Sequence, residues 1–329
     1  MTVTNVALFN DTAASRHFGC DAVSATIEQC VAAAGGRLVH RQPVGRPWDQ
    51  CPQALEAIAA ADVVIVNGEG SIHHGSERTR MLARLAPHCA ERGIPCYLFN
   101  ATLQANDAST MEALAQFTAI WVRESRSRDE LAAAGIAATV CPDLSLFQAL
   151  PEPSAERTGP VFIDSVVKRE TRLLEREAIR HGTVLLSMKR DEEGEYFPAR
   201  HWLTRLVSRY PRRRVPLPGV ADFRAFARYI GQYPALVTGR FHGFCFAVNQ
   251  GIPVAVCRSN TWKCEAMLRD IGLADERLWE RGRRVLPQPY STHEQHALSA
   301  YRDEARRMIP AVFAEMLGTD DATTARGPV

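Results

Sequence analysis

The chain has 329 residues, of which 46% are hydrophobic and 23% are charged. This composition is ordinary for a soluble globular protein, and the length is more typical of two domains than of one. The formal net charge of +2 argues against a dedicated nucleic-acid-binding protein, which usually has a strong excess of basic residues.

Short apolar runs alternate with longer amphipathic stretches through the first half of the chain. The predicted strands are residues 5–10, 36–40, 62–67, 96–100, 119–122 and 138–141. The predicted helices are residues 22–34, 53–60, 78–92, 109–116 and 126–134. The run ADVVIVNG is apolar at successive positions, as expected for a central strand that is covered on both faces. This alternation predicts a doubly wound parallel sheet.

The alternation breaks at LPEPSAERTGP, residues 150–160, which contains three prolines and reads as a linker. A second series of strands is predicted at residues 161–166, 184–188, 214–217, 236–238 and 254–257. Helices are predicted near residues 201–209, 222–230, 244–250, 262–271 and 293–317.

These elements predict an N-terminal domain over residues 1–150, a C-terminal domain over residues 158–318 and a flexible tail over residues 319–329. The fold class is therefore α/β, with two Rossmann-like doubly wound parallel-sheet domains. We expect the carboxyl ends of both sheets to face a cleft.

The nine cysteines are scattered and include no C-x-x-C pair. An odd number without metal-ligand spacing predicts buried, reduced thiols and neither a disulfide framework nor a zinc site. Residues 1–9 lack the apolar segment of a signal peptide, and the chain has no run of about 18 apolar residues. We therefore expect a cytoplasmic protein.

Polar residues collect where the predicted strands of the first domain end. Glycines at such turns allow a ligand to approach backbone amides closely. Acidic and histidine side chains beside them indicate a binding or catalytic site. The candidates in this domain are Asn10, Asn67, Gly68, Glu69, Gly70, His74, Asn100 and Arg123. Alternatively, the histidines only hydrogen-bond across a domain interface, and the segment of Arg123, WVRESRSRDEL, only caps a helix.

A second polar cluster follows two strands of the second domain, in VTGRFHGFCFAVNQGIPVAVCR (residues 237–258) and SNTWKCEAML (residues 259–268). Free amides at a helix N-terminus, a forked guanidinium and an imidazole together suit an anionic ligand. The candidates are Gly239, Arg240, His242, Gly243, Ser259, Asn260, Lys263 and Glu265. The alternative is a structural histidine beside a surface arginine.

At these residues the chain resembles the polysaccharide pyruvyl transferase family. The matching pieces are ADVVIVNGEG, WVRES, CPDLSLF, VTGRFHGFCFAVNQGIPV and SNTWKCEAMLRDIGL, over roughly residues 5–275. The resemblance implies a two-domain fold like that of GT-B glycosyltransferases. It also implies transfer of a pyruvyl ketal from phosphoenolpyruvate to a sugar of a glycan precursor, with release of phosphate.

On the family pattern, Arg240 and His242 match the donor-site residues, Arg123 a second arginine and His74 a histidine of the first domain. We expect His242 to act as acid or phosphate ligand and either His74 or Glu69 to act as base, with no metal or other cofactor. The loop NDTAASRHFGCDA is longer than the family pattern, and Gly-Glu-Gly replaces a common run of three glycines. We assign both loops to the acceptor side of the first domain.

A glycosyltransferase that uses a nucleotide-activated sugar, such as a cytidine-linked acidic sugar, is the alternative function. Arg240 and the following helix would then hold the phosphates and Glu265 the ribose. The expected partner is a saccharide or lipid-linked glycan acceptor, not a nucleic acid. The basic runs YPRRRV (residues 210–215) and ERGRRV (residues 280–285) suit peripheral contact with anionic lipid at the inner membrane face, or are solvated arginines.

Overall fold

The computed structural model describes residues 3–190, 195–196, 214–215, 219–280 and 286–319, with the backbone alone at 195–196 and 214–215. The chain divides into two compact units. The first unit is Met1–Ala14, Ser24–Leu144 and Asp303–Val329, and the second unit is Ser15–Val23 and Ser145–Arg302. The chain passes from the first unit to the second after Leu144, close to the predicted linker over residues 150–160. The short segment Ser15–Val23, however, belongs to the second unit.

The sheet of the first unit is parallel throughout and has the order β2-β1-β3-β4-β5-β6. Its strands are β1 (Thr4–Asp11), β2 (Gly36–Pro43), β3 (Val63–His73), β4 (Cys96–Gln104), β5 (Ala119–Val122) and β6 (Thr139–Val140). All six were predicted. The central strands β1, β3 and β4 are buried almost throughout, as apolar strands covered on both faces must be.

Two central strands of the first unit run past their predicted ends. β3 was predicted to stop at Asn67 and β4 at Asn100, but they continue to pair through Ile72–Leu103 and His73–Gln104. The pairing shifts between Glu69 and Ile72. Pairing with a neighbouring strand therefore overrides the turn signal of the glycines, as happens when tertiary context competes with local preference.

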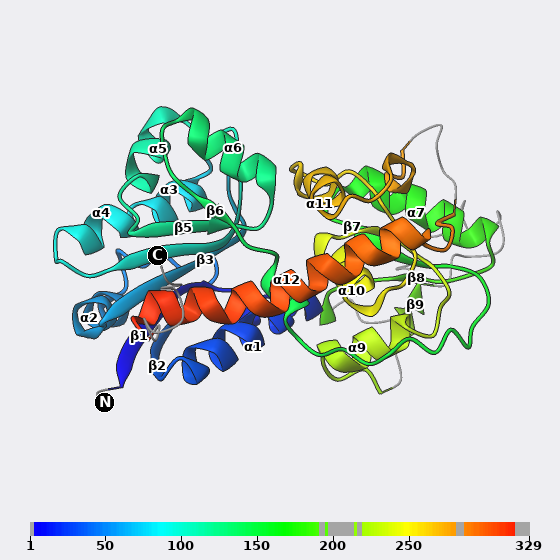
Figure 1. The fold of residues 1–329 in the computed structure, drawn as a ribbon, viewed down its shortest axis with the longest axis horizontal. Coiled ribbons are helices and arrows are strands. Elements are labelled where there is room, and N and C mark those ends of the chain that lie inside the picture. Colours follow the sequence, from blue (N-terminus) through cyan, green and yellow to red (C-terminus); the bar gives the residue numbers. More distant parts are fainter. Residues whose placement is uncertain (1–2, 191–194, 197–213, 216–218, 281–285, 320–329) are drawn as a thin grey trace, which may run out of the picture. The chain divides into compact units, whose positions relative to one another are not determined.

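Helices cover both faces of the first sheet. They are α1 (Phe18–Ala33), α2 (Pro52–Ala60), α3 (Glu77–Ala83), α4 (Leu85–Ala90), α5 (Ala108–Leu114), α6 (Ser125–Ala133) and the end of α12 (Thr292–Leu317). One buried cluster joins the sheet to α2 through α6, and Figure 1 shows α1 and α12 on the side opposite α5 and α6. The helix predicted over 78–92 is two helices, because the chain turns at Arg84.

The sheet of the second unit has the order β10-β9-β8-β7-β11-β12. Its parallel strands are β8 (Leu185–Leu186), β7 (Val161–Ser165), β11 (Leu236–Gly239) and β12 (Val254–Val256). The antiparallel strands β9 (Glu195–Tyr196) and β10 (Arg214–Val215) extend one edge. The prediction of two Rossmann-like α/β domains is confirmed.

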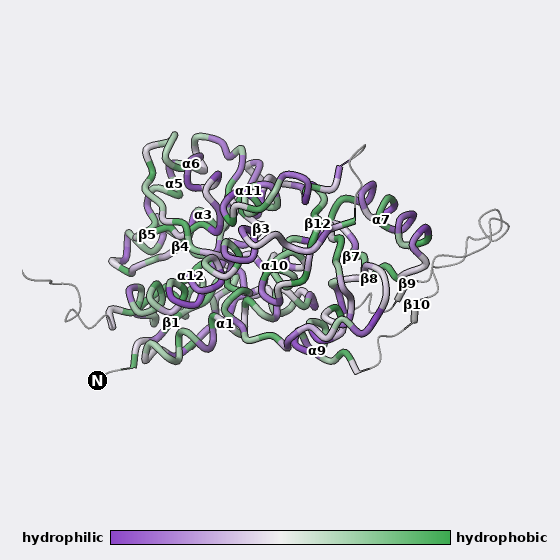
Figure 2. The backbone as a smooth tube through the Cα atoms, turned by 45° about the vertical axis from the view of Figure 1, so that its right-hand side comes forward, coloured by the Kyte–Doolittle hydropathy of each residue, from purple (hydrophilic) through white to green (hydrophobic). Residues whose placement is uncertain are grey.

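The helices of the second unit are α7 (Lys168–Arg180), α9 (Phe223–Ile230), α10 (Phe241–Gln250), α11 (Lys263–Ile271) and the start of α12. The sequence analysis missed α7, whose length is mostly hydrophilic (Figure 2). Only Leu174, Glu177 and Ala178 of this helix are buried, so its apolar stripe is too narrow to stand out. The helix predicted at 201–209 lies outside the described residues. No helix in the described part of the chain has the length and hydropathy needed to cross a membrane.

Candidate active site

The strand order of the first unit reverses between β1 and β3. β1 leads to β2 on one side, whereas β3 leads to β4, β5 and β6 on the other. In open α/β sheets, ligands bind beyond the carboxyl ends of the strands at such a switch point. The residues there are Asn10 and Thr12 on the β1 side, with Asn67 and Glu69 on the β3 side.

These four residues are hydrogen-bonded to one another. The Asn10 side-chain amide donates to the Asn67 carbonyl oxygen at 2.6 Å. The Thr12 hydroxyl and the Asn67 amide both donate to Glu69 Oε1, at 2.5 and 2.9 Å. Asn100 on β4 extends the network, because its amide donates to Asn67 Oδ1 at 3.4 Å. The predicted residues Asn10, Asn67, Glu69 and Asn100 therefore do come together, and all four are buried.

The backbone is unusual at three of these positions. Asn10 has φ 59°, Glu69 has φ 36° and Asn100 has φ 59°. A non-glycine residue in this region costs on the order of 1–3 kcal/mol and persists only where its surroundings hold it. Such residues cluster at functional sites. Three of them on adjacent strands support a functional site at this switch point.

His74 lies elsewhere in the first unit. It follows the end of β3 and has φ 57°, and its ring nitrogen Nδ1 lies 2.8 Å from Nδ1 of His73. Glu69 belongs to the hydrogen-bonded network at the switch point, whereas His74 contacts His73. The two candidate bases are true alternatives.

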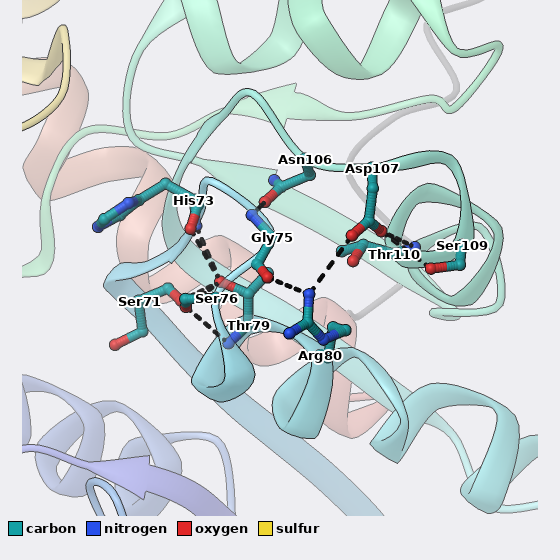
Figure 3. A network of polar contacts seen from close by, with 10 residues as sticks. All are labelled: Ser71, His73, Gly75, Ser76, Thr79, Arg80, Asn106, Asp107, Ser109 and Thr110. Carbon is teal, nitrogen blue, oxygen red and sulfur yellow. Dashed lines mark hydrogen bonds and ion pairs between the residues drawn. The ribbon is translucent and has the colours of Figure 1, made fainter.

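A polar network fixes the turn that carries His73 and His74 (Figure 3). The Thr79 hydroxyl donates to the carbonyl oxygens of Ser71 and His73, at 2.9 and 3.2 Å. The Gly75 amide donates to Asn106 Oδ1 at 3.2 Å. The imidazole of His73 points away from this network (Figure 3). The side chains of Thr79 and Asn106 thus hold the backbone of the turn without using the His73 imidazole.

Arg123 does not lie in an open site. Its side chain is 2% exposed and its Nη1 lies 3.0 Å from Asp143 Oδ2, while its Nε donates to the Thr102 hydroxyl at 2.8 Å. Asp143 is fully buried. This geometry is that of a buried ion pair that fixes the segment after β6. Anion binding by Arg123 stays a prediction.

The second unit has its own switch point, between β7 and β11. β7 leads to β8 on one side and β11 leads to β12 on the other. Asp164 and Ser165 end β7, Gly239 ends β11, and Arg240 follows directly as the N-cap of α10. A Cβ atom on Gly239 would lie 2.3 Å from the Ser165 Cβ atom. Glycine is therefore required here so that the two strands can approach.

Arg240 is held by Asp164 in a two-point ion pair. The Arg240 Nε donates to Oδ1 at 2.8 Å and Nη2 donates to Oδ2 at 2.5 Å. The two side chains are only 11% and 9% exposed. The Thr238 hydroxyl accepts from the Arg240 amide at 3.0 Å. Backbone and guanidinium are both fixed before any ligand binds, which favours tight and directional contact with an anion.

His242 stands in the first turn of α10 and is 7% exposed. It packs against residues far away in the sequence. A Cβ atom on Gly19 would lie 2.2 Å from the His242 Cβ atom, and the His17 and His242 ring centroids are 5.5 Å apart. The segment around His17, which the sequence analysis placed on the acceptor side, thus contributes to the second unit and packs directly on His242.

The backbone of this segment is joined to the end of β8. The Phe18 amide donates to the Met188 carbonyl oxygen at 3.0 Å, and the Arg190 amide donates to the Arg16 carbonyl oxygen at 2.7 Å. His17 pairs with Lys189 between these two bonds. We call His17, Lys189, Arg240 and His242 the second-unit cluster.

Burial lowers the pKa of His17 well below its usual 6.5, and the nearby His242, Arg240 and Lys189 lower it further. His17 is therefore neutral at pH 7. Its ring, that of His242 and the thiol of Cys20 have metal-binding atoms within 4.8 Å of one another. Lys189 and the Arg240 guanidinium, which is paired with Asp164, lie close enough to lower the pKa of His17, and positive charge opposes a metal ion and favours an anion. Anion binding at this place stays a prediction.

The remaining candidates follow β12. The Lys263 ammonium donates to Asn260 Oδ1 at 2.6 Å, and the Ser259 hydroxyl donates to the same oxygen at 3.2 Å. Glu265 is paired with Arg258 at 2.9 Å. The structure thus links Ser259, Asn260 and Lys263 at the carboxyl end of the strand next to β11, whereas Glu265 faces a different cation.

The sequence matches the polysaccharide pyruvyl transferase family over residues 15–261, about three quarters of the chain. The chain belongs to this family. As a member of the polysaccharide pyruvyl transferases, it is a transferase. Family membership supports pyruvyl transfer and does not favour the alternative of nucleotide-sugar transfer. No curated protein matched the chain.

Several solved structures are similar in fold. S. aureus MnaA with UDP shares 10% identity, with 96% of this chain and 91% of that chain covered and a TM-score of 0.49. A putative UDP-N-acetylglucosamine 2-epimerase from Listeria monocytogenes shares 10%, with 96% and 94% covered and a TM-score of 0.48. An uncharacterized protein from Klebsiella pneumoniae shares 11%, with 81% and 88% covered and a TM-score of 0.45. Similarities this low carry no argument about the substrate of this pyruvyl transferase.

Two of the glycines predicted as binding residues, Gly68 and Gly243, are explained by close packing. A Cβ atom on Gly68 would lie 2.4 Å from the Ala101 Cβ atom, and one on Gly243 would lie 2.6 Å from the Thr238 hydroxyl oxygen. Close packing of β3 on β4 and of α10 on β11 therefore accounts for these two glycines without a ligand. Gly70 is half-buried in β3, next to Glu69.

Four residues of the candidate site were not predicted as site residues from the sequence: Thr12, His17, Asp164 and Lys189. Asp164 had a signal, because it is the one acid in the apolar run VFIDSVV. His17 lies in a loop that was already noted as polar. Its assignment to the second unit depends on pairing with Lys189, some 170 residues away in the sequence, and no local pattern predicts that pairing.

Proposed function

We propose that this protein transfers a pyruvyl ketal from phosphoenolpyruvate to a saccharide, with the donor on the second unit and the acceptor on the first. The second-unit cluster carries the proposal. It combines a guanidinium fixed by Asp164 with two imidazoles beside the switch point of one sheet, and Lys189 is close enough to lower the pKa of His17. Phosphoenolpyruvate has a carboxylate and a phosphate, and positively charged hydrogen-bond donors are the groups that bind both.

The reaction needs an acid near the donor. A proton adds to the methylene carbon of phosphoenolpyruvate, and the electron pair of the double bond forms the new C–H bond. The neighbouring carbon becomes oxocarbenium-like and is attacked by a sugar hydroxyl. The C–O bond to phosphate then breaks, phosphate leaves with the electron pair, and a second hydroxyl closes the ketal. The two sugar hydroxyls lose one proton each. One of these protons replaces the proton that the acid gave to the methyl group, and the other ends on the released phosphate.

Within this scheme Arg240 holds a negatively charged group of the donor, and Asp164 positions the guanidinium. His242 is the acid or a phosphate ligand, since an imidazole can exchange a proton near neutral pH. Asn260 and Lys263 border the same carboxyl edge. Guanidinium and ammonium groups supply the positive charge, so the proposal includes no metal ion.

On the acceptor side, we propose Glu69 as the base that takes the hydroxyl proton. Its carboxylate is held by Thr12 and Asn67 at the first switch point, and its strained backbone is held in place by the strands around it. His74 is the alternative base. The acceptor is a glycan precursor, which suits a cytoplasmic enzyme that also contacts anionic lipid. The basic runs proposed for that contact, residues 210–215 and 280–285, lie almost wholly outside the described residues.

A ligand screen by thermal unfolding tests the proposal. A ligand that binds only the folded protein raises the unfolding temperature. We expect phosphoenolpyruvate to raise it, and CMP and UDP at equal concentration to leave it unchanged. Stabilisation by either nucleotide without stabilisation by phosphoenolpyruvate would contradict the proposal and support a nucleotide-sugar donor.

A further inference from the structure

We infer that His17 is a further substrate-contacting residue of the second unit, a neutral imidazole that donates its Nε2–H hydrogen bond to an anionic group of the donor. This inference rests on the proposed function, because it needs an anionic donor at the second-unit cluster. It gives His17 a role different from that of His242. The His17 ring donates a hydrogen bond without changing its charge, and the His242 ring remains available for proton transfer.

The tautomer of His17 is set by the backbone. The Gly19 amide donates to His17 Nδ1 at 3.2 Å. A nitrogen that accepts a hydrogen bond carries no proton, so the neutral ring has its proton on Nε2. Protonation of Nδ1 would turn this contact into one between two donors. The same bond that orients the ring therefore opposes the imidazolium form.

The groups around His17 also keep it neutral. The ring is 9% exposed. His242 and Arg240 face it from the β11–α10 connection and Lys189 from the end of β8, and each lowers the pKa of His17 after the larger effect of burial. A second cation at this position is unfavourable, whereas a neutral hydrogen-bond donor is not.

The other charges near His17 are already compensated or uncharged. Asp21, four residues further along, is paired with Arg190, and Asp164 is paired with Arg240. Cys20 contributes a buried thiol. Among the described residues, no acidic side chain raises the pKa of His17; a backbone hydrogen bond raises it, whereas burial, His242, Arg240 and Lys189 lower it. An anionic ligand fits the local charge, and a neutral N–H adds a contact without the cost of burying another charge.

The position of the ring is fixed by packing as well as by hydrogen bonds. Gly19 lets the segment lie directly against His242, and the strand-like pairing with Lys189 holds the backbone on the other side. A side chain held at both ends of its segment loses little entropy when a ligand binds. Such a residue is suited to orienting the donor beside His242.

Replacement of His17 by glutamine or by asparagine distinguishes a neutral hydrogen-bond donor from a residue that carries a proton or only packs. The amide nitrogen of glutamine can occupy nearly the place of Nε2 and donates one hydrogen bond without charge, whereas asparagine is too short. Calorimetric titration with phosphoenolpyruvate should give H17Q an affinity within a few-fold of wild type. H17N and H17A should each lose roughly tenfold or more, the usual effect of removing one hydrogen bond to a charged group.

Proton exchange on binding provides the second readout. Titrations at pH 7 in buffers of different ionisation enthalpy give the number of protons taken up, which should be the same in wild type and H17Q. An equal loss of affinity in H17Q and H17A would overturn the inference, as would proton uptake that disappears in H17Q. Failure of phosphoenolpyruvate to bind wild type would instead contradict the proposed function, and the inference with it.

Discussion

Replacement of Arg240 by lysine should weaken donor binding as well as lower the free energy of unfolding. The guanidinium makes two hydrogen bonds to Asp164, at 2.8 and 2.5 Å, and these fix the plane in which it meets a ligand. An ammonium has no planar fork and cannot reproduce this two-point geometry, so we expect it to lose at least one of the contacts that the guanidinium makes. A hydrogen bond to a charged group contributes about 1.5–3 kcal/mol, so losing one should weaken phosphoenolpyruvate binding by roughly 10- to 150-fold.

The second unit offers a matched control in Arg277. Its Nε and Nη2 donate to the two carboxylate oxygens of Glu294, at 2.6 and 2.9 Å, and the two side chains are 7% and 10% exposed. Arg277 also contacts the Val254 carbonyl oxygen at the start of β12, so it lies at the amino edge of the sheet. R277K and R240K should lower the free energy of unfolding by similar amounts, about 1–3 kcal/mol.

Only R240K should change the affinity for phosphoenolpyruvate, measured by calorimetric titration at pH 7, while urea unfolding reports the stability of both variants. If R240K binds phosphoenolpyruvate like wild type, Arg240 is not a donor contact. An equal loss of affinity in R277K would show that the effect comes from weakened folding and not from the site.

Three further predictions concern other parts of the molecule. The pKa of His17 is lowered in the folded protein, so below pH 6.5 this imidazole is protonated more readily in the unfolded chain than in the folded one. Through this group, the free energy of unfolding of wild type should fall by at most about 1.4 kcal/mol per pH unit as the pH is lowered. Urea unfolding between pH 7 and pH 5 should show a smaller loss in H17Q, and parallel curves would refute the assignment. E69Q should lower turnover at least roughly 100-fold with phosphoenolpyruvate affinity unchanged, whereas H74A should retain turnover; the reverse pattern would make His74 the base. Residues 210–215 and 280–285 predict co-sedimentation with anionic phospholipid vesicles that high salt abolishes, and no sedimentation at physiological salt would exclude membrane contact of this kind.

Local patterns predicted the sheets well. Residues 119–122 form β5 as predicted, and ADVVIVNG lies in the buried strand β3, because continuous apolar runs have few other places in an α/β fold. The apolar pattern of the sequence predicted the wrong strand ends where pairing with a neighbouring strand decides how far a strand extends. β3 continues through its glycines because β4 continues beside it. α7 was missed because three buried residues give little periodicity in a strongly charged segment.

The site was predicted in part for the same reason. Arg240 and His242 stand directly after an apolar strand, so their place at a sheet edge follows from the sequence. The pairing of Arg240 with Asp164 and the packing of His17 on His242 depend on strand order and on a segment that belongs to the second unit. Arg123 had the same kind of sequence signal as Arg240. Its complete burial against Asp143 is set by tertiary packing, which the sequence pattern does not reveal.

A crystal structure of the protein with phosphoenolpyruvate tests the central claim most directly. Density for phosphoenolpyruvate should lie at the carboxyl edge of the second sheet, with a negatively charged group on Arg240 and either the methylene carbon or the phosphate next to His242. Phosphoenolpyruvate bound away from Arg240 and His242, or on the first unit, would contradict the account.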